Sequence, residues 1–258
     1  MTVRELYAEL EKKIPKSLSC VWDNDGLLCC PDGRRETKKI LIALDVTNEV
    51  AEHAIKNGYD CIISHHPFIF KGLKALDCDG DLSAKALRLI CNGISVMSFH
   101  TRLDAAQGGV NDKLCELFGL GDVSTFDDEG IPLGRVGELD TEMSAEDFAR
   151  LVKNALHAPF VLLCDAGVPV KRVAVLGGSG KDLIDAARAT GADAFVSGRL
   201  DYHPMTDGVE CKSAPMNLIE AGHFYTEQPV CDVLADMVGD ICPDIICDVY
   251  VSNVIKAI

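Results

Sequence analysis

Short apolar runs alternate in the first half of the chain with segments whose apolar residues recur at helical spacing. The runs are KILIALDVT, YDCIISHH and ISVMSFHT, rich in β-branched residues as buried strands are. Between and after them lie NEVAEHAIKNG, DLSAKALRLICNG and AQGGVNDKLCELFGL, and the first two end in glycine, a common helix terminator. This βαβα order predicts a largely parallel sheet with helices on its faces.

A second α/β block follows a polar, turn-rich stretch after Gly121, VSTFDDEGIPLGRVGEL, which we interpret as a domain boundary or a strand entry. Helices are predicted over SAEDFARLVKNAL, KDLIDAARATG and FYTEQPVCDVLADMVGD, and strands over VKRVAVLGG, ADAFVSG, APMNLIEAGH and DIICDVYVSN. The predicted fold class is α/β, with two domains that each hold a mostly parallel or mixed sheet and flanking helices. Residues 1–125 with 220–258 form the first domain, and 126–219 form the second, inserted between.

The composition is that of an ordinary globular protein, with 48% hydrophobic and 25% charged residues among 258. A net charge of −15 with scattered Lys and Arg disfavours nucleic-acid binding. No apolar run approaches the roughly 18–20 residues that cross a bilayer, and MTVRELYAELEKKIP has no secretory pattern. The twelve cysteines lack the spacing of zinc knuckles. We therefore expect a cytoplasmic protein with reduced thiols and no membrane partner.

Two adjacent histidines, His65 and His66, end the predicted strand YDCIISHH. Ligands collect at the carboxyl ends of parallel strands, because the loops there meet in a crevice. Adjacent side chains of an extended chain point to opposite sides, and Pro67 favours an extended dipeptide. Two neighbouring metal ions therefore suit this pair better than one ion, and a pair of ordinary structural or surface histidines is the alternative.

A second ligand set, in FHTRLDAAQGGVND, follows the next strand. His100, Thr101 and Asp104 then lie at the same edge of the predicted sheet as the double histidine. Asp104 is a natural hard ligand for a divalent ion, supported by His100 or Thr101. The alternative is that Asp104 caps a helix beginning at Ala105.

The third set is the pair His223 and Glu227 in AGHFYTEQPV. Side chains four residues apart in a helix share one face and lie about 5–6 Å from each other, which is close enough for a common ion. The alternative is that His223 and Glu227 lie on a solvated helix face and bind no ion.

The three sets together contain more ligands than one catalytic zinc takes from a protein, which is usually three. We therefore predict two divalent metal ions per chain, drawn from Zn, Mn, Fe, Co or Ni. In such a site a carboxylate such as Glu227 can bridge ions about 3.5–4 Å apart, and a bridging water becomes a hydroxide nucleophile. The predicted ligands are His65, His66, Asp104, His223 and Glu227.

Three further stretches are weaker candidates. GGSGKDL resembles a phosphate-binding loop between a strand and a helix, or is a plain tight turn. WDNDGL reads as an ordered loop in which Asp23 could support the metal ligands. Polar residues that follow a strand and could bind an anionic substrate are Arg199, Asp201, Tyr202 and His203.

These motifs together resemble the Nif-three-like family, the type-two GTP cyclohydrolase I homologs. Seven motifs follow one another in the family's order over nearly the whole chain: WDNDGL, ALDVT, SHHPFIF, HTRLDAAQGGVND, GGSGKDL, SGRLDYH and AGHFYTE. The resemblance implies a Nif-three-like fold, a dinuclear site on the five ligands with Glu227 as the bridge, and a homohexameric toroid. Arg199 departs from the pattern, because the family commonly has an acidic residue after the glycine of SG-x-x-x-YH. A substrate shared with the family therefore does not follow.

The resulting hypothesis is a metal-dependent hydrolase acting on a small molecule such as a nucleotide or phosphoester. Its catalytic candidates are Glu227, His203 and His100, the two histidines as proton shuttles. The family name implies opening of the GTP imidazole ring, yet the sequence shows no clear purine or triphosphate pocket, and a fold does not fix a function. A non-catalytic metal-binding or chaperone-like protein and a scaffold ring are the alternatives.

Overall fold

The computed structural model describes residues 1–128 and 130–256. Contacts within the chain divide it into two compact units, each described by itself below. Unit 1 consists of Met1–Leu103 and Val230–Lys256, and unit 2 of Asp104–Pro229. Both are α/β, as the sequence predicts.

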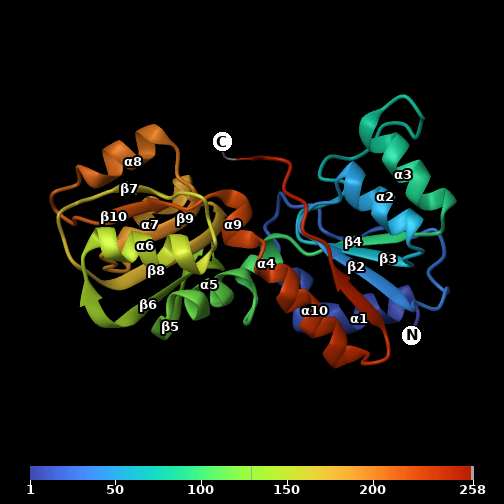
Figure 1. Cartoon of the computed structure of the whole chain (residues 1–258), viewed down its shortest axis with the longest axis horizontal. Coiled ribbons are helices and arrows are strands. Elements are labelled where there is room, and N and C mark those ends of the chain that lie inside the picture. The colour runs from blue at the N-terminus through green and yellow to red at the C-terminus, as the bar shows by residue number, and fades with distance from the viewer. Residues whose placement is uncertain (129, 257–258) are drawn as a thin grey trace. The chain divides into compact units, whose positions relative to one another are not determined.

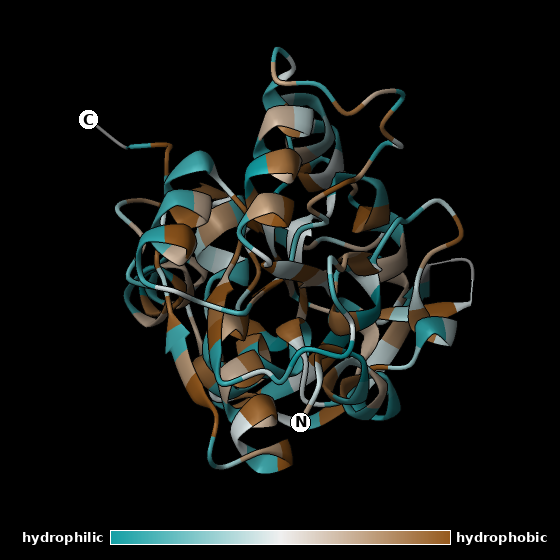
Figure 2. Cartoon of the chain, turned by 90° about the vertical axis from the view of Figure 1, so that its right-hand side faces the viewer, coloured by the Kyte–Doolittle hydropathy of each residue, from teal (hydrophilic) through white to brown (hydrophobic). Residues whose placement is uncertain are grey.

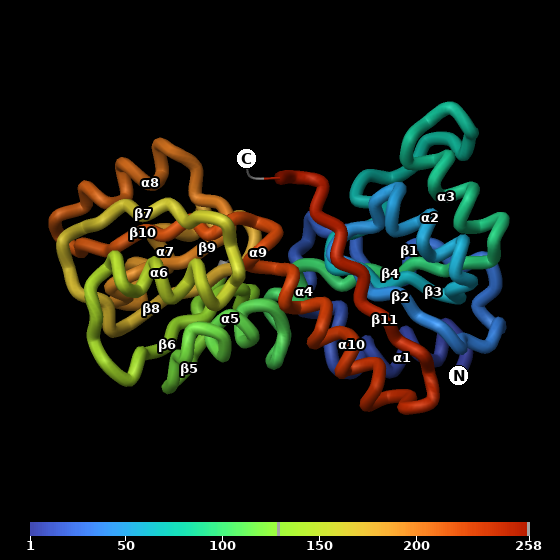
Figure 3. The backbone as a smooth tube through the Cα atoms, viewed as in Figure 1, coloured from blue at the N-terminus to red at the C-terminus, as the bar shows by residue number. Residues whose placement is uncertain are grey.

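Unit 1 is built on a sheet with the strand order β1-β4-β3-β2-β11. All neighbours in it are parallel except the edge strand β1, which is antiparallel to β4. The strands are β1 (Gly26–Cys29), β2 (Lys39–Ala43), β3 (Cys61–Ser64), β4 (Ser95–Ser98) and β11 (Ile246–Val249). In Figure 3 the red β11 runs beside the blue β2. The last residues of β2, β3 and β4 are paired with one another across the sheet, Ala43 with Ser64 and Ser64 with Ser98. These three strands therefore all end at the same edge.

Helices cover both faces of this sheet: α2 and α3 lie on one face, and α1 and α10 on the other (Figure 1). The helices are α1 (Val3–Lys13), α2 (Asn48–Lys56), α3 (Asp81–Cys91) and α10 (Val230–Ile241), with the short η1 (Lys16–Leu18) after α1. Figure 2 shows hydrophobic and hydrophilic residues side by side on the helical turns. This is the amphipathic pattern from which the helices were predicted, because one stripe packs on the sheet while the other faces water.

Unit 2 is built on a mixed sheet with the order β5-β6-β8-β9-β10-β7. Its strands are β5 (Gly121–Asp128), β6 (Ile131–Met143), β7 (Leu162–Cys164), β8 (Val170–Ser179), β9 (Ala194–Arg199) and β10 (Asn217–Glu220). β8, β9 and β10 are parallel, and the other neighbours are antiparallel. The polar stretch after Gly121 is thus a pair of long antiparallel strands, although residue 129 between them lies outside the described residues.

The sheet of unit 2 also has helices on both faces. Residues of α5 and α6 share one apolar core with Val173, Val196 and Ile219 of the sheet. The opposite face carries α7 and α8, both of which contact sheet strands. The bounds are α5 (Val110–Phe118), α6 (Ala145–Ala155), η2 (Lys181–Leu183), α7 (Ile184–Ala189), α8 (Tyr202–Val209) and α9 (His223–Glu227). The short α4 (Thr101–Ala105) includes the last residues of the first segment of unit 1 and the first residues of unit 2.

Two details differ from the sequence-based expectation. Unit 2 begins at Asp104 and ends at Pro229, beyond the expected 126–219, because α5 and α9 pack on its strands. The single helix predicted over FYTEQPVCDVLADMVGD is wrong, since α9 ends at Glu227 and α10 begins at Val230. Pro229 has no N–H to continue the helical hydrogen bonds, so the chain breaks there. Among the described residues, no helix has both the length and the apolar character needed to cross a membrane.

Candidate metal centre

The double histidine lies directly after β3, where the chain bends. β3 ends at Ser64, and the Ser64 hydroxyl donates to the backbone oxygen of His66 at 2.8 Å while the His66 N–H donates to Leu44 O at 3.0 Å. The rings of His65 and His66 are only 5.0 Å apart between centroids. The expected extended dipeptide with rings on opposite sides is therefore wrong, because the bend brings both rings together.

A third ring, that of His100, joins them from the end of β4. Its centroid is 5.3 Å from that of His65 and 5.6 Å from that of His66. One ring nitrogen of each of these three histidines lies within 4.8 Å of the other two, so they form a group that could hold a metal ion. We call it the three-histidine group. It exists because β3 and β4 end in the same row.

Each ring of the three-histidine group is oriented by an oxygen at its Nδ1. The partners are Phe99 O at 2.9 Å from His65, Asp45 Oδ1 at 2.8 Å from His66, and Asp23 Oδ1 at 3.0 Å from His100. An oxygen acceptor at Nδ1 favours the tautomer that carries its proton there, and this tautomer keeps the Nε2 lone pair for a ligand bond. Histidine ligands of protein metals are usually oriented in this way.

Asp23, the partner of His100, is itself firmly held. Its side chain is fully buried, and its Oδ2 accepts from Thr101 N at 3.1 Å and from Thr101 Oγ1 at 2.6 Å. Burial by itself would raise the pKa of this carboxyl, but the hydrogen bonds from His100 and Thr101 outweigh it and bring the pKa to about 2. The carboxylate is therefore charged at neutral pH and fixes the ring of His100.

Unit 2 gathers the other three predicted ligands. In α9, His223 Nε2 lies 3.0 Å from Glu227 Oε2, as the spacing of four residues predicts. One carboxylate oxygen of Asp104 lies within 4.8 Å of one of Glu227, and both residues are buried. The alternative of a solvated helix face is wrong for Glu227, because it is only 3% exposed. The N-cap alternative for Asp104 is also wrong, because Asp104 lies inside α4.

Glycines of the sheet allow α9 to approach it closely. A Cβ built on Gly178 would come within 3.0 Å of Glu227 Oε1, and one on Gly198 would come within 3.0 Å of Thr226 Oγ1 and of the His223 Cα. Gly178 also has a φ of +67°, which side chains rarely adopt. The sequence GGSGKDL thus serves to seat the His223–Glu227 helix, a role that its likeness to phosphate loops did not suggest.

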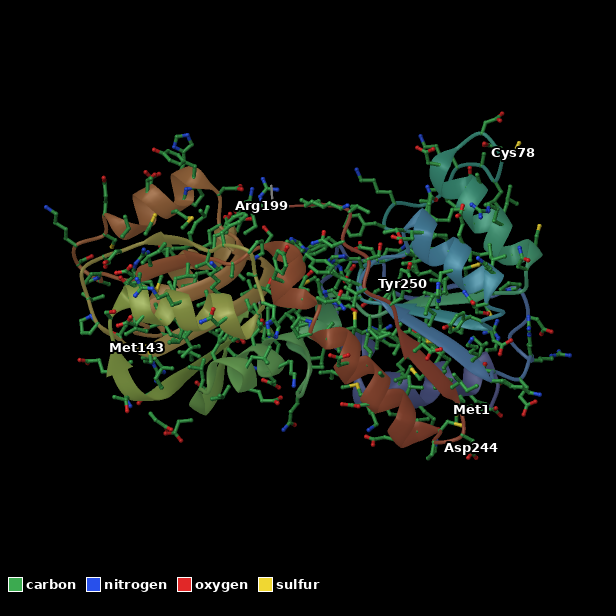
Figure 4. All side chains as sticks on the ribbon, viewed as in Figure 1. Met1, Cys78, Met143, Arg199, Asp244 and Tyr250 are labelled. Carbon is green, nitrogen blue, oxygen red and sulfur yellow. The ribbon has the colours of Figure 1, made fainter. Side chains whose placement is uncertain are left out.

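The remaining candidates lie elsewhere in unit 2. His203 is exposed on α8 and belongs to none of the metal-holding groups found among the described residues. Arg199 projects outward from the end of β9 and is 64% exposed (Figure 4). Its Nε lies 2.6 Å from Asp201 Oδ1, and this hydrogen bond lowers the pKa of Asp201. Arg199 is therefore paired with a carboxylate of its own loop.

One functional residue escaped the sequence analysis. Asp45, which orients His66, stands in the ALDVT run just after β2. The sequence did contain a cue for Asp45. Because β2 ends at the same sheet edge as β3 and β4, a carboxylate directly after β2 is within reach of the ligands that follow those strands.

Comparison with known proteins places this arrangement in a family. Residues 1–257 match the family described as Duf34/NIF3 (NGG1p interacting factor 3). The chain belongs to the Duf34/NIF3 family. This confirms the resemblance inferred from the motifs.

Curated relatives and solved structures agree with this membership. A Clostridium perfringens protein named GTP cyclohydrolase 1 type 2 homolog is 34% identical over 236 residues, which is 89% of this chain and 88% of that protein. A solved Staphylococcus aureus hypothetical protein is 30% identical with a TM-score of 0.86, over 100% of this chain and 99% of that one. A Bacillus cereus protein related to NIF3 shares the fold, with a TM-score of 0.88 at 23% identity and the same coverage.

Proposed function

We propose that this Duf34/NIF3 protein binds two divalent metal ions and uses them to hydrolyse a small molecule such as a nucleotide or phosphoester. The proposed ligands are the five residues predicted from the sequence: His65, His66, Asp104, His223 and Glu227. The observation that carries the proposal is the orientation of the His65 and His66 rings by oxygens at Nδ1. This arrangement is the one that prepares imidazoles for divalent ions.

The donor chemistry of the two units is complementary. Unit 1 offers imidazole nitrogens, and unit 2 offers the carboxylates of Asp104 and Glu227 with one further imidazole. Such a mixed nitrogen and oxygen set suits Zn, Mn, Fe, Co or Ni.

In this proposal, residues of the chain orient the ligands and transfer protons. Asp45 holds His66 through its Nδ1, and the backbone of Phe99 holds His65, so both rings keep their direction during turnover. His100 keeps its Nδ1 proton on Asp23 and can accept a proton at Nε2, as a general base must. Divalent ions, when bound, act as Lewis acids on a phosphoryl or carbonyl oxygen and make water more acidic.

The hydrolase proposal is tested by turnover. Metal-loaded protein is assayed against nucleoside triphosphates, GTP among them, and phosphomonoesters, beside Glu227→Gln and His100→Gln. Glu116→Gln, at an exposed carboxylate of α5, is the matched control. We expect turnover in the native protein and the control, its loss in Glu227→Gln, and a reduced rate in His100→Gln. Full activity in Glu227→Gln would refute the proposal, and metal binding without any turnover would favour a non-catalytic metal-binding protein.

The homohexamer and the role of His203 stay predictions. Light scattering coupled to size exclusion measures the mass of the assembly directly, and a hexamer of the 27.8 kDa chain is expected. His203→Gln is expected to slow turnover without changing metal content, since His203 was predicted as a proton shuttle.

A further inference from the structure

Two aromatic side chains of unit 1 are exposed beside the three-histidine group. Trp22 is 62% exposed and Phe70 is 45% exposed. Their ring centroids are 6.2 Å apart at an interplanar angle of 67°, and each meets the ring of His100 edge to face, at 6.2 and 6.3 Å. We call Trp22, Phe70 and His100 the aromatic corner.

Hydrogen bonds of neighbouring residues anchor the two loops that carry Trp22 and Phe70. Asp23, next to Trp22, is buried and bonded to both His100 and Thr101. Asn24 Nδ2 donates to Ile69 O at 2.5 Å, which ties the loop of Trp22 to the loop of Phe70. Loops that are held in place before a ligand arrives lose little entropy on binding, so this geometry suits recognition.

The size of the corner separates a small ligand from a protein partner. Aromatic side chains bury about 150–250 Å² each when fully covered, so these two half-exposed rings offer on the order of 200 Å². A stable protein interface needs about 800 Å² from each partner. One planar ring system, in contrast, is covered well by stacking on a single tryptophan face.

We propose that the aromatic corner binds the planar heteroaromatic ring of a small-molecule ligand, such as a nucleobase, by stacking on the face of Trp22 while Phe70 meets the edge of the bound ring. His100 belongs to both the corner and the three-histidine group. A ring stacked on the corner therefore directs the rest of its molecule toward His65 and His66. The inference rests on the proposed function only in this last step, because stacking itself requires no metal and no turnover.

Trp22 is the single tryptophan of the chain, so its fluorescence reports the corner alone. The full-length protein is titrated with GMP and AMP, and with ribose 5-phosphate as the probe that lacks a base, with N-acetyltryptophanamide correcting for absorbance. We expect saturable quenching by the two nucleotides and none by ribose 5-phosphate. Phe70→Leu is expected to weaken nucleotide binding by about 2- to 12-fold, the usual worth of one edge-to-face aromatic contact.

Phe160→Leu is the matched control, because Phe160 is 57% exposed in unit 2, outside the aromatic corner. It should bind nucleotides as the native protein does. Trp22→Phe should keep binding and Trp22→Leu should lose it, both measured by calorimetry, with circular dichroism showing that each variant is folded. Equal affinities for Phe70→Leu and Phe160→Leu, or equal quenching by ribose 5-phosphate, would overturn the proposal. A change of assembly mass in Phe70→Leu with unchanged affinity would also overturn it, and would identify the corner as a contact between copies.

Failure of this inference is distinguishable from failure of the proposed function. The titration is repeated on protein stripped with EDTA. Quenching in the stripped protein together with no turnover by the metal-loaded protein supports the aromatic corner and rejects the hydrolase. Turnover by the metal-loaded protein without base-dependent quenching does the reverse.

Discussion

Replacement of Gly178 by alanine perturbs the candidate site through a single methyl group. The added Cβ would come within 3.0 Å of Glu227 Oε1, closer than real Cβ atoms approach, and within 3.4 Å of the His223 ring. The carboxylate must retreat by roughly 0.5–1 Å, while metal–ligand distances tolerate about 0.2 Å. We expect metal affinity to fall by about 10–100-fold, as when a ligand loses its orientation.

The same substitution also costs stability, because Gly178 has a φ of +67°. Alanine in this left-handed conformation costs about 1–2 kcal/mol. For a domain of this size, each kcal/mol lowers Tm by about 2–4 °C. Gly191→Ala separates the two effects, since Gly191 has a φ of +76° and nothing within 4 Å of its added Cβ.

The assay is competition with a chromogenic chelator for Zn²⁺ or Mn²⁺, beside thermal unfolding of the metal-free proteins. Both variants should unfold at lower temperature, and Gly178→Ala alone should bind metal more weakly. Native metal affinity in Gly178→Ala would refute the reasoning, because it would mean that Glu227 has no part in holding the ions. Equal loss of affinity in both variants would show that backbone strain, and not the contact with Glu227, is responsible.

Three further predictions concern unit 1. Arg102 and Asp25 form a fully buried ion pair with an Nε–Oδ2 distance of 3.1 Å, so Arg102→Met should lower the free energy of unfolding by about 3–5 kcal/mol in urea titrations, and a loss below 1 kcal/mol would contradict this. Asp45→Asn should weaken metal binding about 10–100-fold by releasing His66, with unchanged affinity as the contrary result. Asp23 has a pKa lowered from 3.8 to about 2, so its stabilisation of about 2 kcal/mol is complete above about pH 5 and is lost progressively as the pH falls through 2. In EDTA-treated protein, Asp23→Asn should therefore make the free energy of unfolding less dependent on pH in the acid range. An unchanged pH dependence would contradict the pairing of Asp23 with His100 and Thr101.

Much of this fold follows from local pattern. The apolar runs that end in SHH and HT predicted β3 and β4, and parallel strands bring their carboxyl ends to one edge. This rule alone predicted that His65, His66 and His100 lie together. The i,i+4 spacing likewise gave the approach of His223 to Glu227.

The sequence could not supply what depends on exact backbone direction. The bend after Ser64 that turns two adjacent histidines to one side is set by hydrogen bonds to Leu44 and within the turn, which leave no periodic signal. The role of Gly178 depends on its φ and on the distance to α9, and neither is visible in GGSGKDL. The break between α9 and α10 was readable from Pro229, but the strong helical pattern on either side outweighed it.

The central claim is that the five ligands hold two ions, and elemental analysis of metal per chain tests it most directly. Protein purified without oxygen or chelators is measured beside His65→Ala and Glu227→Gln, with His53→Ala as the control, because His53 is a unit 1 histidine outside the three-histidine group. The account predicts about two ions per chain in the native protein and the control, and a loss in both ligand variants. Native protein without metal under adequate supply, or variants that keep both ions, would contradict it.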